Sequence, residues 1–311
     1  LLAQELADVL DALDETDIAA IVLKGPVLAT TLYPHPGLRP ISDLDLLVTE
    51  DRFEQAISAV QARGYTLEEA AGWTERDVSP EVHLSADEKP ALNVELHWTL
   101  IGGASTRYRV EMDWFWGQAA PQSPPAAPAP GALTLSATAQ LLYLAAHLVY
   151  KHSAGQARLI WFYDLHRLAE SGAVDWALAR RQAAAFGWSA ALRLALGGTQ
   201  IRLHTALPEG LLAALETDAP EGPERLLRIQ TGRVQTRSMH GLARLLSLRG
   251  SARWRALGKT LFPSPAQLRR FYGPRPDWLL PAFYPLRWLA LARDAFGTLA
   301  QVLRSGAREA G

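Results

Sequence analysis

The chain has 311 residues, of which 49% are hydrophobic and 20% charged, and its formal net charge is −1. This balance is typical of a folded globular protein with one large domain or two ordinary ones. The absence of cysteine excludes disulfides and thiolate metal sites. No uninterrupted apolar stretch approaches the length of a membrane span, so we predict no transmembrane segment and expect a cytoplasmic protein.

The first third of the chain predicts helices alternating with strands. Its start has the pattern of an amphipathic helix and not of a secretory signal. In chain order, we predict a helix over 1–16, a strand over 18–24, a short helical segment to Tyr33, a turn at 34–37, a strand over 39–48, a helix over 51–63, and two strands over 78–85 and 91–100 around a turn at 86–90.

The strand over 39–48 carries two carboxylates, Asp43 and Asp45, in an otherwise apolar run. Asp is disfavoured in strands, and side chains two residues apart point to the same face, so these two carboxylates stand side by side. Like charges this close raise each other's pKa unless a cation lies between them. Carboxylates suit Mg²⁺, which commonly keeps waters and substrate phosphates as its other ligands. The pair therefore points to a metal–phosphate site, and a pair that caps the next turn is the alternative.

The context of this pair resembles a known family. Four segments carry the resemblance: Leu23-Lys24-Gly25-Pro26, Leu32-Tyr33-Pro34, Gly37-Leu38-Arg39-Pro40 and Ser42-Asp43-Leu44-Asp45-Leu46-Leu47-Val48. They resemble a poorly characterised family of DNA polymerase β-like nucleotidyltransferases, and the resemblance continues to about Asp164. It implies a metal-dependent transferase of the α+β class, in which a small mixed-sheet nucleotidyltransferase palm domain is followed by an all-helical domain.

A third carboxylate is available on the last of the predicted strands. Glu95 and His97 alternate onto one face, and His83 lies roughly opposite Glu95 across the hairpin. The resemblance places the third acid of the metal site on this strand, where Glu95 is the matching residue. A Glu on an edge strand facing water is the alternative. We predict that Asp43, Asp45 and Glu95 are catalytic and hold two Mg²⁺ ions, with Mn²⁺ as an alternative metal.

Lys24 and Arg39 are the predicted contacts to the donor phosphates. Lys24 ends a strand beside a glycine turn, and Arg39 offers a bidentate fork. Either could instead pair with the Asp residues. Better-known nucleotidyltransferases carry Gly-Ser or Gly-Gly where this chain has Gly25-Pro26, a departure that leaves room for Lys24 to replace the missing phosphate contacts. The resemblance also implies that Gly25 and Ser42, in the first and last of the four segments, contribute to nucleotide binding.

Composition divides the chain at a Pro/Ala-rich segment. We predict a nucleotidyltransferase domain over 1–116, an extended linker over 117–132, and a helical substrate domain with a basic, aromatic C-terminal region over 133–311. The helices predicted in the last domain cover 136–152, 156–171, 175–186, 188–205, 208–217 and 286–304. Acidic residues predominate before residue 225 and basic residues after it, which suggests an anionic partner at this end. Solvated or packed Arg-rich helices are the alternative.

Two further candidates interrupt an apolar helix of the second domain. His147 and Lys151 are four residues apart and share a helix face, and Asp164 on the next helix is placed to orient either one. We assign both to nucleotide or substrate binding, with a satisfied His–Asp network in the core as the equal alternative. A zinc site is disfavoured because His147 and His152, five residues apart, do not align on one face.

These features predict a Mg²⁺-dependent nucleotidyltransferase. The reaction would move a nucleoside monophosphate from an NTP, with ATP as the expected donor, to an anionic small-molecule or peptide acceptor by in-line transfer. Two alternatives are glycosyl transfer from a nucleotide-sugar at the same metal site, and a non-catalytic transferase fold that binds a peptide or nucleic acid. Nucleic acid is the weaker candidate because the whole chain is not basic and carries no recognised nucleic-acid-binding motif.

Overall fold

A computed structural model of the chain describes residues 2–68, 79–86, 93–104, 106, 108–122, 129, 132–152, 157–219, 245, 247–273, 275–294 and 296. Residues 87–90 of the predicted turn and 123–128 of the predicted linker lie outside this part, as does the end of the predicted helix over 286–304.

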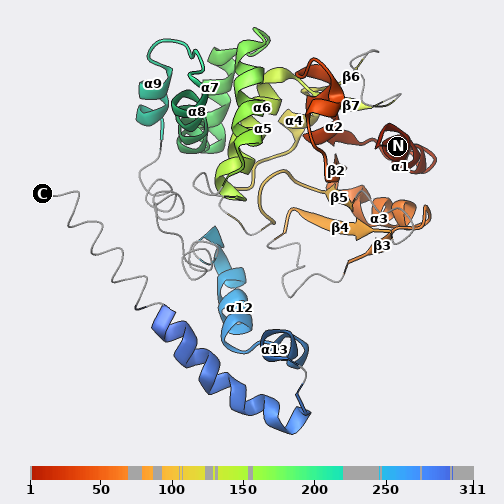
Figure 1. Ribbon diagram of the computed structural model, residues 1–311, viewed down its shortest axis with the longest axis vertical. Helices are drawn as coiled ribbons and strands as arrows, with labels where there is room; N and C mark the ends of the chain where they lie inside the picture. Colours follow the sequence, from red (N-terminus) through yellow and green to blue (C-terminus); the bar gives the residue numbers. More distant parts are fainter. Residues whose placement is uncertain are drawn as a thin grey trace, which may run out of the picture.

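A mixed sheet forms the centre of the described structure (Figure 1). Its seven strands have the order β3-β4-β5-β2-β1-β7-β6. They are β1 (Ile21–Leu23), β2 (Asp43–Leu47), β3 (Thr66–Leu67), β4 (Glu81–Ser85), β5 (Asn93–His97), β6 (Ala119–Pro121) and β7 (Leu133–Leu135). Strand β2 runs antiparallel to β1 and parallel to β5. The predicted mixed sheet with accompanying helices is confirmed.

The helices that accompany the sheet lie before or between its strands in sequence. They are α1 (Leu2–Asp14), α2 (Gly25–Thr31), η1 (Pro36–Leu38), η2 (Glu50–Arg52), α3 (Phe53–Gln61) and α4 (Asp113–Trp116). On one face of the sheet, the buried Leu44 and Leu46 pack with residues of α1 and α3. Because side chains alternate along a strand, Asp43 and Asp45 lie on the other face.

A helical bundle packs against that other face. It consists of α5 (Ala137–Tyr150), α6 (Leu159–Glu170), α7 (Trp176–Phe186), α8 (Ser189–Leu203) and α9 (Leu211–Thr217). Helix α5 begins where the Ser136 side chain accepts a hydrogen bond from Ala139 N, as N-cap residues do. Its buried Tyr143 packs with Leu23 and Leu47 of the sheet, so α5 covers the strands that carry the Asp pair.

Strands β6 and β7 join the sheet beside β1. Strand β6 lies within the predicted linker and β7 at the start of the predicted helical domain, so the sheet draws on both segments. The division of the chain at residues 117 and 133 stays a prediction.

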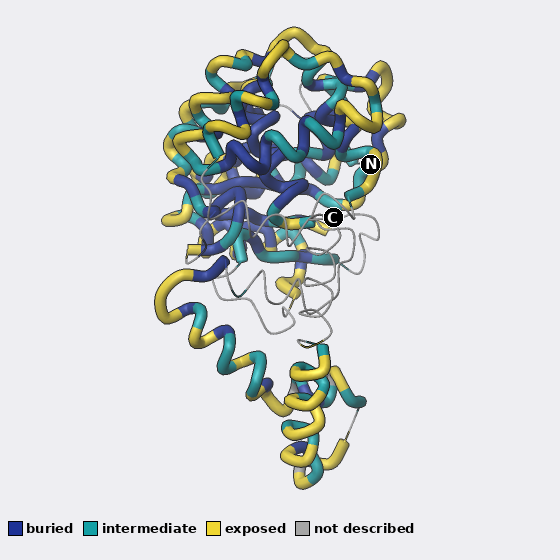
Figure 2. The backbone as a smooth tube through the Cα atoms, turned by 90° about the vertical axis from the view of Figure 1, so that its left-hand side faces the viewer, coloured by how far each residue is buried: buried dark blue, intermediate teal, exposed yellow. Residues whose placement is uncertain are grey.

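The last described segment is an arm that extends away from the sheet in both views (Figures 1 and 2) and is largely exposed. It contains α12 (Gly250–Leu261), α13 (Pro265–Tyr272), η3 (Asp277–Ala282) and a helix over 283–294. Arg287 Nε donates to Thr260 O and Trp288 Nε1 donates to Leu261 O, so these two side chains of the basic, aromatic region hold the arm together. Among the described helices, none has the length and apolar character to cross a membrane.

Candidate functional site

Two neighbouring parallel strands bring the predicted carboxylates together. In the register of β2 and β5, Asp45 pairs with Glu95 and Leu47 pairs with His97. Across β4 and β5, His83 pairs with Glu95, which confirms the predicted hairpin register. Asp45, Glu95 and His97 therefore share the face of the sheet that α5 covers.

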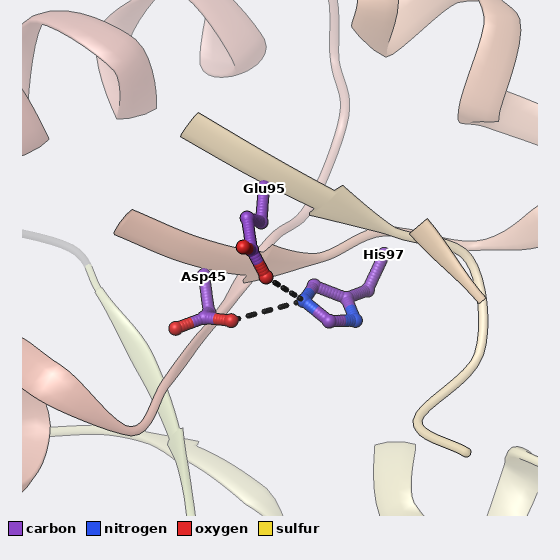
Figure 3. Close-up of side chains that lie close together, drawn as sticks. All are labelled: Asp45, Glu95 and His97. Carbon is purple, nitrogen blue, oxygen red and sulfur yellow. Dashed lines mark hydrogen bonds and ion pairs between the residues drawn. The ribbon is translucent and has the colours of Figure 1, made fainter. Parts of the chain in front are cut away.

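Asp45, Glu95 and His97 converge on one point (Figure 3). His97 Nε2 lies 3.1 Å from Asp45 Oδ1 and 3.7 Å from Glu95 Oε2. Within the described residues, this is the set whose donor atoms, all within 4.8 Å of one another, could share an ion. Carboxylate oxygens and imidazole nitrogens are ordinary ligands of divalent metals. Asp43 is not in this set; it lies half-buried at the start of β2.

The ammonium of Lys24 also reaches this set. Its Nζ lies 2.5 Å from Asp45 Oδ1 and 3.5 Å from His147 Nε2. The backbone of Lys24 has φ 43° and ψ −114°, a conformation that glycine adopts far more readily. Lys24 thus forms the turn that directs the chain from β1 into α2, and its side chain pairs with Asp45.

A second cation lies on the other side of Glu95. Lys151 Nζ is 2.8 Å from Glu81 Oε1 and 3.4 Å from Glu95 Oε2. Glu81 is buried on β4, and its Oε2 lies 3.5 Å from His97 Nδ1. Tyr143 and His147 on α5 and Lys151 at its C-cap are spaced by four residues, and this spacing lines them along the site. The expected common helix face of His147 and Lys151 is thus directed at the carboxylates.

This mixture of charges moves the pKa values of the two Asp residues in opposite directions. Burial, Asp45 and Glu95 raise the pKa of Asp43. Burial opposes the charged form of Asp45 as well, but Lys24 and His97 hold the pKa of Asp45 below its usual value. The expected mutual effect is confirmed for Asp43, while Asp45 follows the stated exception, because the cations Lys24 and His97 lie beside it.

The pKa values of Lys24, His97 and Glu95 shift toward their charged forms in the metal-free site. Burial disfavours the ammonium of Lys24, yet Asp45 raises its pKa. Burial likewise disfavours the imidazolium of His97, but hydrogen bonds to Asp45 and Glu95 raise its pKa. Burial opposes ionisation of Glu95, while His83, His97 and Lys151 hold its pKa well below the usual range. The face is a compact array of alternating charges.

The sequence profile of a family described as uncharacterised nucleotidyltransferase matches residues 1–204. The chain belongs to this family. The match includes the whole of the site, from Lys24 before α2 to Lys151 after α5, and it makes the chain a nucleotidyltransferase. The suspected resemblance is thereby confirmed. No curated protein matches the sequence.

Solved structures similar to part of this nucleotidyltransferase include antibiotic-modifying enzymes. The solution structure of the antibiotic-resistance factor ANT(2'')-Ia has 11% identity and a TM-score of 0.39, covering 54% of this chain and 83% of that one. The lincomycin-bound lincosamide antibiotic adenylyltransferase LnuA has 18% identity and a TM-score of 0.37, covering 54% and 96%. ANT(2'')-Ia in complex with adenylyl-2''-tobramycin has 13% identity and a TM-score of 0.41, covering 59% and 95%.

Arg39 is placed differently from the other predicted site residues. Its Nε and Nη2 donate to the two carboxylate oxygens of Asp164 at 3.0 and 2.8 Å, and Tyr33 OH donates to Asp164 Oδ1 at 2.7 Å. Asp164 therefore binds Arg39 and Tyr33; the expectation that it orients His147 or Lys151 is wrong. Gly25 lies against the same guanidinium, since a Cβ there would lie 3.5 Å from Arg39 Nη1. Ser42 is exposed, directly before β2.

The two histidines after the middle of α5 meet, contrary to the expectation from their spacing. His147 Nε2 lies 3.0 Å from His152 Nε2. Helix α5 ends at Tyr150, so the helical wheel does not govern the position of His152. The ring of His152 also stacks near Trp161, with centroids 4.3 Å apart. The argument against convergence of these rings is therefore wrong.

The histidine pair predicts a pH dependence of stability. Burial, followed by the charges of Lys151 and Lys24, lowers the pKa of His152 to about 4, against about 6.5 in an unfolded chain. Above pH 6.5 the ring of His152 is neutral in both states and does not reduce the free energy of unfolding. As the pH falls from 6.5 toward 4, the unfolded chain takes up a proton at this residue that the folded protein does not, so the free energy of unfolding decreases. We expect His152→Gln to reduce the fall in Tm over this window, measured by calorimetry.

The control for this experiment is His204→Asn. His204 is exposed and has a left-handed φ of 54°, which Asn tolerates. Its variant should keep the wild-type slope of Tm against pH. An unchanged slope in His152→Gln would contradict the assignment of a neutral, half-buried ring at this position.

Two members of the site escaped the sequence analysis. Glu81 was not singled out, and His97 was placed on the correct face without a role. Both belong to Glu-x-His pairs, Glu81 with His83 and Glu95 with His97, on the two strands of the predicted hairpin. Alternating acid and imidazole on two paired strands was the available signal.

Proposed function

We propose that this nucleotidyltransferase moves a nucleoside monophosphate from an NTP, with ATP as the donor, to an anionic small-molecule or peptide acceptor in the cytoplasm. The observation that supports it best is the buried convergence of Asp45, Glu95 and His97 on adjacent strands of a nucleotidyltransferase-family chain. This set has the donor atoms and spacing for a divalent ion. Asp43, Asp45 and Glu95 would hold two Mg²⁺ ions.

When bound, these ions would neutralise phosphate charge and lower the pKa of the acceptor group. The protein's own residues have separate tasks. Lys24 brings an ammonium to Asp45, where it can compensate the charge of the donor's phosphates. Lys151 and His147 line the same face from α5 and would contact the donor, together with Gly25 and Ser42 near the start of α2 and β2.

In the proposed step, a lone pair of the acceptor oxygen attacks the α-phosphorus. A new P–O bond forms, the bond from the α-phosphorus to the bridging oxygen breaks, and pyrophosphate leaves with that electron pair. The acceptor's proton passes to a carboxylate of the site or to water. Catalysis consists of positioning and charge compensation, as in other phosphoryl transfers.

The proposal keeps the predicted division of labour along the chain. Residues 1–116 would form the catalytic domain, 117–132 the connection, and 133–311 the substrate domain. The basic C-terminal arm would attract the anionic acceptor, and nucleic acid stays a weaker candidate because the chain as a whole has a formal net charge of −1.

The test is a Mg²⁺-dependent assay of pyrophosphate release from each NTP with panels of small molecules and peptides, followed by mass spectrometry of the acceptor. A mass gain of one nucleoside monophosphate supports the proposal. A mass gain of one sugar from a nucleotide-sugar identifies glycosyl transfer instead. Donor binding without metal-dependent turnover on any acceptor would favour the non-catalytic module.

Glu95→Gln is expected to lower kcat by about a hundredfold or more, a loss typical of removing a group that handles a proton or charge in the transition state. Donor affinity should fall much less, because Gln keeps the size of Glu and an acceptor oxygen. Steady-state kinetics and calorimetric titration of the donor separate the two effects. Glu50→Gln is the control, since Glu50 is 47% exposed and pairs with Arg109 on the surface. Equal losses of donor affinity and kcat would make Glu95 a structural residue.

A further inference from the structure

The imidazole of His97 points into the carboxylate set with the spacing of a metal ligand. Two bonds of about 2.1 Å to one ion, at angles between 90° and 109°, place their donor atoms about 3.0–3.4 Å apart. His97 Nε2 lies 3.1 Å from Asp45 Oδ1 and 3.7 Å from Glu95 Oε2. One ion can therefore contact all three side chains after small adjustments.

A buried oxygen beside this set supports the same conclusion. Asp45 is 1% exposed, and its Oδ2 is buried without a hydrogen-bond partner among the described residues. A buried carboxylate oxygen without a partner is costly, because its desolvation is not compensated. Its other oxygen, Oδ1, already accepts contacts from Lys24 and His97. Oδ2 points away from His97 (Figure 3), so it would gain a partner only if Asp45 bound the ion through both of its oxygens.

Glu81 holds the far side of the His97 ring. Glu81 Oε2 lies 3.5 Å from His97 Nδ1, and both atoms are buried without a hydrogen-bond partner among the described residues, while Glu81 Oε1 is fixed by Lys151 Nζ at 2.8 Å. Each of these two atoms is therefore the nearest charged partner for the other, and a small approach would form the Nδ1–H to carboxylate bond that orients metal-binding histidines and leaves the lone pair of Nε2 for the metal. Both residues are buried, Glu81 at 6% and His97 at 0% exposure, so the ring has no room to turn away.

We propose that His97, with Glu81 behind it, is an additional metal ligand through which one ion position of this site binds a divalent transition-metal ion more tightly than it binds Mg²⁺. The inference rests on the proposed function, since it concerns the ion of that same reaction. Mg²⁺ requires oxygen ligands and keeps its waters, whereas transition metals accept an imidazole together with carboxylates. Asp45, Glu95 and His97 supply two oxygens and one nitrogen, a set that favours an ion such as Mn²⁺.

The test measures binding of the metal alone, without nucleotide. Mn²⁺ is titrated by electron paramagnetic resonance, and Mg²⁺ is measured by its ability to displace Mn²⁺. We expect wild type to prefer Mn²⁺. His97→Gln keeps a hydrogen-bonding side chain but removes the imidazole, and it should lower Mn²⁺ affinity about tenfold or more while changing Mg²⁺ affinity much less. Glu81→Gln should weaken Mn²⁺ binding in the range of about 10–100-fold known for residues behind a ligand.

Two controls keep the test decisive. His204→Asn, at an exposed site, should bind both ions as wild type does. Circular dichroism checks that each variant is folded, and if His97→Gln fails to fold, Glu81→Gln carries the test. Equal affinities of wild type for the two ions, or equal losses for both ions in the variants, would overturn the proposal and leave His97 as a counter-charge.

Failure of this inference is distinguishable from failure of the proposed function. If the enzyme releases pyrophosphate with either ion but binds both equally, the selectivity inference fails and nucleotidyl transfer stands. If Mn²⁺ binding depends on His97 but neither ion supports release of pyrophosphate, His97 is a ligand and the proposed reaction fails.

Discussion

Asp43→Asn and Asp45→Asn are expected to abolish metal-dependent nucleotidyl transfer alike, but to shift the melting temperature of the metal-free protein in opposite directions. Asp45 is buried and carries ion pairs to Lys24 and His97. Removing its charge leaves two buried cations without their partner, which costs on the order of 3 kcal/mol. Asp43 is half-buried, and burial with two carboxylate neighbours raises its pKa. Removing its charge relieves repulsion and should raise Tm slightly.

The signs follow from the direction of each pKa shift. A carboxyl whose folded-state pKa is lowered, as in Asp45, stabilises the fold above its unfolded pKa, and this stabilisation is lost as the pH falls through the folded value. A carboxyl whose pKa is raised, as in Asp43, destabilises the fold in its charged form at neutral pH. Differential scanning calorimetry at pH 7 without metal measures both effects.

Activity and metal–nucleotide titrations complete this comparison. Both variants should lose Mg²⁺-nucleotide affinity, because each removes an expected metal ligand. Glu50→Gln, on the surface, is the control for loss of one negative charge. A fall in Tm for both Asp variants would contradict the assignment of Asp43 as the repelled carboxylate. Unchanged Mg²⁺-nucleotide affinity in both would refute the metal site itself.

Local patterns predicted the parts of this site that depend on a single strand or helix. The period of two along β2 and β5 placed Asp43 with Asp45, and Glu95 with His97, on common faces. The four-residue spacing on α5 aligned His147 with Lys151. The pairing of Lys24 with an Asp was predicted as the alternative to a phosphate contact. A cation beside two carboxylates compensates their negative charge.

Long-range pairing decided the rest. The local sequences of β2 and β5 do not predict that these strands pair in parallel. This pairing brings Asp45 beside Glu95. Likewise, only the packing of α6 against the segment before β2 reveals that Arg39 binds Asp164. A guanidinium in a loop before an acidic strand has the same local pattern whether it contacts phosphate or a distant carboxylate, so the sequence could not distinguish these roles.

Breaking the pair of Arg39 and Asp164 is expected to destabilise the protein by about 3–5 kcal/mol, the range for removing one partner of a buried pair. Asp164 accepts both Arg39 bonds and a hydrogen bond from Tyr33 OH, and it is 1% exposed. Asp164→Asn should leave the Arg39 guanidinium buried without a counter-charge. Urea unfolding followed by circular dichroism measures the loss.

The chain offers a matched surface pair as the control. Arg180 binds Asp218 in the same bidentate manner, at 2.6 and 3.1 Å, but on the exposed surface. Asp218→Asn should cost less than about 1 kcal/mol, as exposed ion pairs do. Equal effects of the two Asn variants would contradict the buried role of Asp164.

The double variant Arg39→Met, Asp164→Leu separates a structural role of Arg39 from contact with the donor. Replacing both charges by apolar side chains of similar size should restore much of the stability lost in Asp164→Asn, because no buried charge is then left unpaired. Donor titrations on this folded protein decide the second role. If Arg39 also contacts the donor, triphosphate binding should weaken by about 1.5–3 kcal/mol while nucleoside binding does not change. Unchanged binding of both ligands would assign Arg39 to the attachment of α6 alone and leave Lys24 and Lys151 as the cations that face the donor.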